Sequence, residues 1–106
     1  MAETNITDLL EALRSYRPER IYLVGSYARG EEDELSDIDL VIIKDTTAPF
    51  LERMREVGRL LPAELGGIDL LVYSPGEFAA MLAAGNAFAE MVAEEGRLVY
   101  DAKAQG

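Results

Sequence analysis

Two aspartates separated by a single residue carry the clearest chemical signal in this sequence. Asp37 and Asp39 belong to the run DIDLVII, residues 37–43, whose other members are apolar. Side chains two residues apart on a strand point to the same face, so the two carboxylates would lie one pleat apart. Like charges this close repel each other unless a cation lies between them, and Mg²⁺ prefers oxygen ligands of this kind. The alternative is a loop cap at Asp37 and a solvated Asp39 at the end of a sheet.

A third aspartate repeats the pattern on a second apolar run. Asp69 lies in IDLLV, residues 68–72, which parallels IDLVI at residues 38–42. If the two strands are neighbours, its carboxylate lies beside the other two on one face. Three such carboxylates can hold two metal ions about 4 Å apart, the geometry that stabilises both oxygens in phosphoryl or nucleotidyl transfer. The alternative is one acidic residue at a strand edge.

A Gly-Ser pair closes the apolar run at residues 21–24, ahead of the aspartates. Where a strand gives way to a helical turn, unpaired backbone N–H groups and the helix dipole form a site for anions. Gly25 would let a phosphate approach the backbone, and the Ser26 hydroxyl could donate to a phosphate oxygen. Arg29 and Gly30 close the turn, with the guanidinium available to a phosphate or to the acidic run that follows. An ordinary strand-to-helix turn is the alternative.

Composition limits the chemistry further. The chain has 106 residues, no cysteine, no histidine and a formal net charge of −10. Acid-base or metal chemistry must therefore fall to carboxylates, because thiolates, zinc cages and histidine bases are excluded. The negative charge opposes direct binding to nucleic acid and favours a basic protein partner, or a small phosphate ligand that arrives with a cation. With no membrane-length apolar run and no leader-like N-terminus, we expect a cytosolic protein with one domain, residues 1–106.

Apolar periodicity, glycine and proline breaks and capping residues predict the elements that position these side chains. We expect four helices: residues 5–16, a helix that begins at residues 47–49 and ends at residue 61, residues 75–84, and residues 87–95. We expect strands over residues 21–24, 37–43, 68–73 and 98–100. The tail, residues 101–106, is expected to fray. The core is expected to include the helical methionines and phenylalanines, namely Met54, Met81, Met91, Phe50, Phe78 and Phe88. This alternation predicts an α/β (α+β) fold in which helices pack on a small mixed sheet of three to four strands.

The long spaced signature of the chain resembles that of a known family. GSYARG followed by SDIDL is similar to the signature of the DNA polymerase beta-like nucleotidyltransferases, in particular the minimal nucleotidyltransferase (MNT) group. IDLLVYSPGEF is similar to the third-carboxylate strand of that group, and NAFAEMVAEEGRLVYDA is similar to its last helix and strand. The resemblance thus covers most of the chain and implies the nucleotidyltransferase fold.

The resemblance also implies a reaction and a role for each site residue. Gly25 and Ser26 would hold the triphosphate of ATP or another NTP, with Arg29 and Gly30 beside them. Asp37, Asp39 and Asp69 would be the catalytic metal ligands for two Mg²⁺ ions, with Asp69 helping to deprotonate the attacking hydroxyl. The implied reaction moves a nucleoside monophosphate, usually AMP, to a hydroxyl and releases pyrophosphate.

Small members of the MNT group commonly act as the antitoxin of a HEPN-domain toxin and can attach AMP to a tyrosine of it. The resemblance therefore implies a HEPN partner for this chain. Tyr27 stands where many relatives carry a basic residue, which predicts weaker or differently controlled nucleotide binding. Larger relatives add a domain that binds the acceptor, so we expect a partner to supply that surface.

Three functions remain open at this point. The first is an active Mg²⁺-dependent nucleotidyltransferase, and the second is a catalytically silent antitoxin that neutralises a HEPN partner by binding alone. The third is a fragment of a polymerase or RNA-tailing enzyme, which the acidic charge disfavours.

Overall fold

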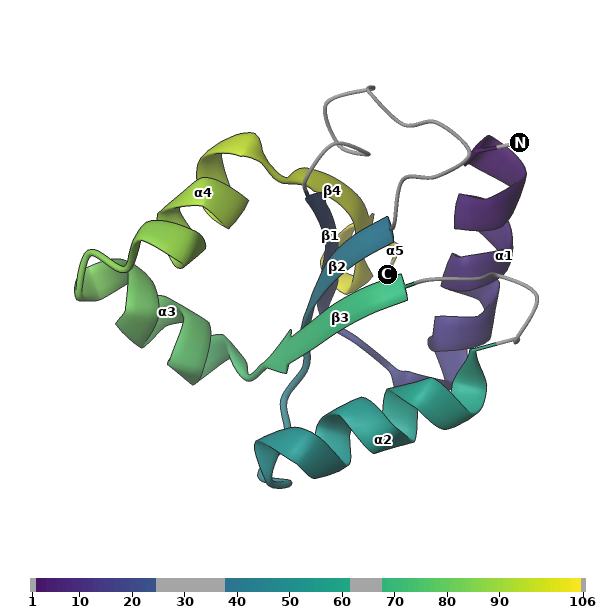
Figure 1. The fold of residues 1–106 in the computed structure, drawn as a ribbon, viewed down its shortest axis with the longest axis horizontal. Helices are drawn as coiled ribbons and strands as arrows, with labels where there is room; N and C mark the ends of the chain where they lie inside the picture. The colour runs from purple at the N-terminus through teal and green to yellow at the C-terminus, as the bar shows by residue number, and fades with distance from the viewer. Residues whose placement is uncertain (1, 25–37, 62–67, 106) are drawn as a thin grey trace.

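The computed structural model describes residues 2–24, 38–61 and 68–105, while residues 1, 25–37, 62–67 and 106 lie outside the described part of the chain. The described residues form five α-helices, one 3₁₀ turn and four strands (Figure 1). The helices are α1 (Ala2–Leu13), α2 (Phe50–Leu60), α3 (Pro75–Ala83), α4 (Ala87–Glu95) and α5 (Ala102–Gln105), with a 3₁₀ turn η1 (Arg14–Tyr16) after α1. The strands are β1 (Arg20–Val24), β2 (Ile38–Ile43), β3 (Ile68–Tyr73) and β4 (Arg97–Asp101).

The four strands form one mixed sheet in the order β3-β2-β1-β4. Strand β1 pairs antiparallel with both β2 and β4, whereas β2 and β3 pair in parallel. Parallel neighbours need a long crossover connection, which helix α2 provides between β2 and β3. The mixed sheet confirms the fold class expected from the sequence, with β3 and β4 at its two edges.

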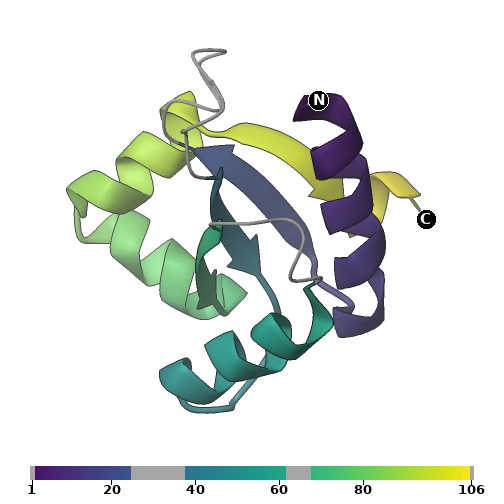
Figure 2. The same ribbon diagram turned by 45° about the vertical axis from the view of Figure 1, so that its right-hand side comes forward.

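Helices cover both faces of this sheet. Figures 1 and 2 show α3 and α4 side by side against one face, and α1 and α2 on the opposite side of the sheet. The alternation of side chains along the strands divides the buried residues accordingly into two clusters. The α1/α2 cluster contains Leu9, Leu13, Tyr16, Ile21, Leu23, Leu40, Ile42, Val57 and Val72. The α3/α4 cluster contains Val24, Val41, Ile43, Phe78, Ala89 and Val92.

Local capping explains where the helices of the α3/α4 layer begin. The Ser74 side chain accepts a hydrogen bond from the Glu77 N–H, and the Glu77 carboxylate accepts one from the Ser74 N–H, which completes the predicted capping box. Helix α4 begins after Asn86, whose side chain accepts from the Ala89 N–H at 3.0 Å. The predicted bounds of α4 and β3 are confirmed.

Three expectations about chain segments were wrong. Residues 101–105 are ordered into the end of β4 and the short helix α5, because the Ala102 N–H donates to the Glu19 C=O and the Lys103 N–H to the Asp101 carboxylate. Helix α2 begins at Phe50 rather than at residues 47–49, and its N-cap residue, Pro49, makes no side-chain capping hydrogen bond. Helix α1 starts at Ala2, three residues earlier than expected. No helix in the described ranges is long and apolar enough to cross a membrane.

Candidate functional site

Two of the three predicted aspartates lie directly opposite each other in the sheet. In the parallel pairing of β2 and β3, Asp39 is the register partner of Asp69. On the other side of β2, Asp39 pairs with Val24, the last residue of β1. The three residues form a row across adjacent strands, and neighbouring strands lie about 4.8 Å apart. The expected neighbourhood of the two carboxylates is confirmed.

Both carboxylates belong to the sheet face that carries α3 and α4. Asp39 alternates with Val41 and Ile43, which are buried in the α3/α4 cluster. Asp69 has the same phase as Leu71 and Tyr73 on β3. The Asp39 residue is half-buried and Asp69 is exposed, so the pair lies where this face opens to solvent.

A cavity of about 570 Å³ opens beside the carboxylate pair. Its lining comes from three strands and two helices, namely Val24, Asp39, Leu40, Val41, Met54, Asp69, Leu70, Leu71, Phe88 and Met91. The volume lies within the range of sites that bind small molecules or single side chains of a partner. The two aspartates are the charged residues of this lining, which includes no lysine or arginine among the described residues. One end of the cavity is therefore anionic and the remainder is apolar.

The apolar wall was not recognised as part of a site from the sequence. Met54, Phe88 and Met91 were expected to be core residues, but they are half-buried and line the cavity. Of the helical methionines and phenylalanines, Phe78 is the one that is fully in the core, and Phe50 is 37% exposed. A signal was present in helix α4, where Phe88 and Met91 widen the apolar stripe beyond Ala89 and Val92, the two residues of this helix that are fully buried.

The donor set fits a hard cation. Two adjacent carboxylates are ligands that Mg²⁺ prefers, and a cation between them would relieve their mutual repulsion. Within the described ranges, no group of three or more potential metal ligands is found. The predicted third ligand, Asp37, lies outside the described residues, as do the phosphate-turn residues Gly25, Ser26, Arg29 and Gly30. Their predicted roles stay predictions.

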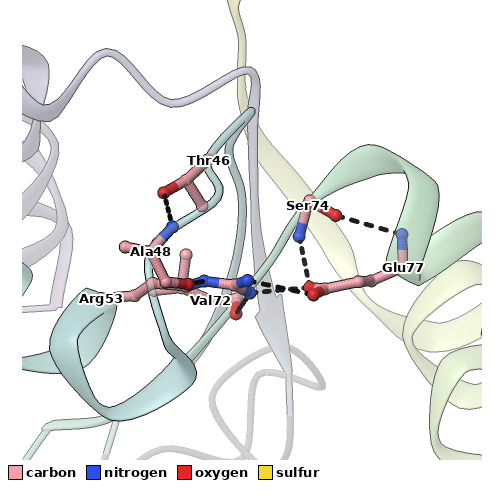
Figure 3. A network of polar contacts seen from close by, with 6 residues as sticks. All are labelled: Thr46, Ala48, Arg53, Val72, Ser74 and Glu77. Carbon is pink, nitrogen blue, oxygen red and sulfur yellow. Dashed lines mark hydrogen bonds and ion pairs between the residues drawn. The ribbon is translucent and has the colours of Figure 1, made fainter.

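A buried arginine connects the elements around the far end of β3 (Figure 3). The Arg53 side chain, on α2, is 6% exposed and pairs with both carboxylate oxygens of Glu77 on α3, at 2.7 and 3.0 Å. It also donates to the Val72 C=O of β3 at 3.1 Å and to the Ala48 C=O at 2.8 Å. One guanidinium thus joins α2, β3 and α3, the three elements that follow the carboxylate strand β2.

The same network shifts the titration of Glu77. The hydrogen bonds from Arg53, followed by the one from the Ser74 N–H, lower the pKa of Glu77 to about 2. The Glu77 pairing in turn raises the pKa of Arg53, which keeps the guanidinium charged. The sequence predicted the Ser74–Glu77 capping box but not the buried partner. Position 53 falls between the apolar positions 50, 54 and 57 of α2, and this is the signal that could have identified a buried arginine.

The comparisons with known proteins agree with this geometry. The profile of the family described as "Nucleotidyltransferase domain" matches residues 6–65. A solved structure from Sulfolobus solfataricus, provisionally named a nucleotidyltransferase, superposes with a TM-score of 0.67 at 22% identity, over 94% of this chain and 80% of that one.

A second solved structure, described as a toxin-antitoxin with AMP-PNP, gives a TM-score of 0.64 at 24% identity, over 90% of this chain and 72% of that one. At these identities the two structures establish the fold. No curated protein sequence matches the chain. The family profile covers more than half of the sequence, and the chain belongs to the nucleotidyltransferase domain family.

Proposed function

We propose that this protein is a Mg²⁺-dependent nucleotidyltransferase that moves a nucleoside monophosphate, AMP from ATP, to a hydroxyl of a protein partner. The observation that carries the proposal is the register pairing of Asp39 with Asp69 at the mouth of a largely apolar cavity. Family membership supports the reaction class. The partner we propose is the HEPN-type toxin of a toxin-antitoxin pair, which the structural similarity to a toxin-antitoxin protein supports.

The proposed reaction assigns a task to each carboxylate. The acceptor oxygen forms a bond to the α-phosphorus of the NTP, the bond from that phosphorus to the bridging oxygen breaks, and pyrophosphate leaves with the electron pair. The Asp69 carboxylate accepts the proton that the acceptor hydroxyl loses. Asp39 and Asp69, together with Asp37, would hold Mg²⁺. A bound Mg²⁺ would neutralise charge that develops on the phosphate oxygens.

The cavity supports this assignment because it limits the access of water to the reacting groups. Its apolar wall limits the number of water molecules that could compete with the acceptor hydroxyl. The Gly25-Ser26 turn, proposed to hold the triphosphate, follows directly on Val24 at the β1 end of the carboxylate row. The nucleotide and the acceptor would then approach the row from opposite ends.

The test is transfer of label from α-labelled ATP in the presence of Mg²⁺. We expect Asp39→Asn and Asp69→Asn each to reduce label transfer by about 100-fold or more, because each removes a charge that acts on the transition state. Asp45→Asn, an exposed aspartate in the β2–α2 connection, is the matched control and should transfer label normally. Unchanged transfer in both site variants would overturn the proposal.

A second candidate is an antitoxin that neutralises its partner by binding alone. The specific observation in its favour is the similarity to a toxin-antitoxin structure, which holds whether or not this chain is active. Under this alternative, the two asparagine variants still form the complex and still suppress the toxin. If suppression is lost while the complex persists, binding alone is excluded.

A further inference from the structure

Strand β3 carries apolar side chains on both of its faces. Leu70 and Val72 pack into the α1/α2 cluster, whereas Tyr73 packs against the α3/α4 cluster. Where one face of a strand is polar, a slip of one residue is penalised because it turns the buried side chains toward solvent. In β3 a slip of one or two residues mostly replaces one apolar side chain with another. The apolar pattern therefore specifies the register of β3 only weakly, and the pairing of Asp69 with Asp39 needs a further determinant.

Polar groups at the C-terminal end of β3 converge on the pair formed by Arg53 and Glu77 (Figure 3). The guanidinium of Arg53 donates to the Val72 C=O at 3.1 Å and to the Glu77 carboxylate at 2.7 and 3.0 Å. The same carboxylate accepts a hydrogen bond from the N–H of Ser74, directly after β3, at 2.9 Å. The pair thus bonds to the backbone on both sides of Tyr73.

These bonds act along the direction in which β3 could slip. One residue step along a strand is about 3.3 Å. A slip of one step would move the Val72 C=O and the Ser74 N–H by that distance, and hydrogen bonds of 3.1 and 2.9 Å do not survive such a displacement. It would also break the bond from the Lys44 N–H, next to β2, to the Tyr73 C=O.

The Arg53–Glu77 pair has little freedom to follow such a slip. Arg53 is 6% exposed, and its Nε donates to the Ala48 C=O at 2.8 Å, in the connection before α2. The planar guanidinium directs its remaining donors at fixed angles. Glu77 is held in turn by the capping box at the start of α3. The pair is therefore a rigid reference for the position of β3 along its own axis.

We propose that the Arg53–Glu77 pair fixes the register of β3 against β2, and that Arg53 is thereby a positioning residue for Asp69. Asp69 precedes Val72 by three residues, about 10 Å along the strand, so fixing one fixes the other. The consequence for the reaction rests on the proposed function, because the register decides whether Asp69 lies opposite Asp39. The geometry of the carboxylate pair is thus assigned to contacts at the other end of β3.

Engineered disulfides measure the register directly, since the chain has no cysteine of its own. Asp39→Cys with Asp69→Cys places thiols on register partners, whose Cα atoms on neighbouring strands are close enough for a disulfide. Asp39→Cys with Leu71→Cys joins residues of the same face that are two positions out of register. The yield of each disulfide in a glutathione redox buffer gives the effective concentration of the two thiols, with the unfolded chain in urea as reference.

In the original background we expect the in-register disulfide to be strongly favoured over the other. Arg53→Met should lower the effective concentration of the in-register pair by about tenfold or more and raise that of the out-of-register pair. Arg53→Lys, which retains the charge but not the planar fork, should have a smaller effect in the same direction.

Two control variants separate register from stability. Arg55→Met removes an exposed arginine of α2, and Leu9→Ala removes a fully buried side chain of α1. Both should leave the ratio of the two disulfides unchanged, although Leu9→Ala lowers the stability of the protein. An unchanged ratio in Arg53→Met, or in Arg53→Lys should the first variant not fold, would overturn the inference. An equal shift in Leu9→Ala would overturn it as well, because loss of stability would then be the cause.

Register and catalysis fail separately in this design, because disulfide formation requires no turnover. If no label is transferred from ATP while the disulfide ratio still depends on Arg53, the proposed function is refuted and the role of Arg53 stands. If label is transferred while the ratio is independent of Arg53, the role of Arg53 alone is refuted.

Discussion

At the scale of single residues, the pairing of Asp39 with Asp69 is costly for the fold by itself. Like charges directly opposite each other on neighbouring strands destabilise a sheet by about 0.2–1 kcal/mol. The described lining of the cavity includes no lysine or arginine. A pair that is unfavourable for folding and favourable for cation binding is typical of a functional site.

This repulsion predicts that Asp69→Asn changes both the stability of the chain without Mg²⁺ and its response to added Mg²⁺. Asp69→Asn removes the repulsion, so without Mg²⁺ the variant should gain about 0.2–1 kcal/mol in free energy of unfolding. Added Mg²⁺ should stabilise the original chain and have little effect on the variant, because ligands that bind the folded state raise its stability. Thermal unfolding with and without Mg²⁺ measures both effects, with Asp45→Asn as the charge-matched control. An equal response of both chains to Mg²⁺ would contradict the metal site.

The Arg53–Glu77 pair predicts how stability changes with pH. The Glu77 pKa is lowered from 4.5 to about 2, so its contribution is fully present above pH 4.5 and is lost as pH falls from 4.5 toward 2. Glu77→Gln should therefore be less stable than the original chain at neutral pH, and the difference should shrink through that window. Urea unfolding at a series of pH values measures it. A difference that stays constant from neutral pH down to 2 would show that the pairing contributes nothing. The pair is half exposed at Glu77, so the effect is modest.

At the scale of elements, the end of α4 must approach β1 closely to form one wall of the cavity. Gly96 terminates α4 and lies against Val24, the β1 member of the carboxylate row. A Cβ atom at Gly96 would lie 2.4 Å from the Val92 carbonyl oxygen and 3.2 Å from Val24 Cγ1. Because a backbone oxygen cannot yield as a flexible side chain does, glycine is required there by space.

Alanine substitutions at Gly96 and Gly58 should therefore change the stability of the protein in opposite directions. Gly96→Ala should destabilise the protein by about 1–3 kcal/mol through overpacking. Gly58→Ala, within α2 where a Cβ meets nothing within 4 Å, should stabilise by about 0.5–1 kcal/mol through the better helix propensity of alanine. Chemical unfolding of both variants provides the comparison. Equal effects of the two changes would contradict the tight packing around Gly96.

Local rules were sufficient to predict most elements and part of the site. Capping side chains and apolar alternation are properties of neighbouring residues, so β3, α4 and the start of α3 could be read from the sequence. Strand order depends on long-range pairing, which is why the sequence could state the contact of Asp39 with Asp69 only as a condition. The pairing of Arg53 with Glu77 and the exposure of Met54 and Met91 depend on how α2, α3 and α4 meet, and no local pattern encodes that.

At the scale of the whole molecule, a net charge of −10 on 106 residues sets the kind of partner that the chain can bind. Electrostatic attraction accelerates association with a basic protein and weakens as salt increases. An interface of ordinary size involves some 20–30 residues on each side, far more than the carboxylate pair. Catalysis and partner binding should therefore separate in variants of the site.

This separation predicts that Asp39→Asn and Asp69→Asn abolish transfer but keep the complex. We expect both variants to elute with the partner in size-exclusion chromatography at the same position as the original chain. Raising the salt concentration should weaken all three complexes alike. Loss of the complex in both variants would mean that the carboxylates bind the partner and would contradict their assignment to the reaction.

The most direct test of the central claim is label transfer from α-labelled ATP in an extract of the source cells. The original chain, Asp69→Asn and the control Asp45→Asn are each incubated with Mg²⁺ and the extract, and the labelled product is identified by mass spectrometry. Our account predicts AMP on a hydroxyl of a single basic protein, present with the original chain and the control and absent with Asp69→Asn. Label of equal intensity with Asp69→Asn, on the same protein, would contradict it.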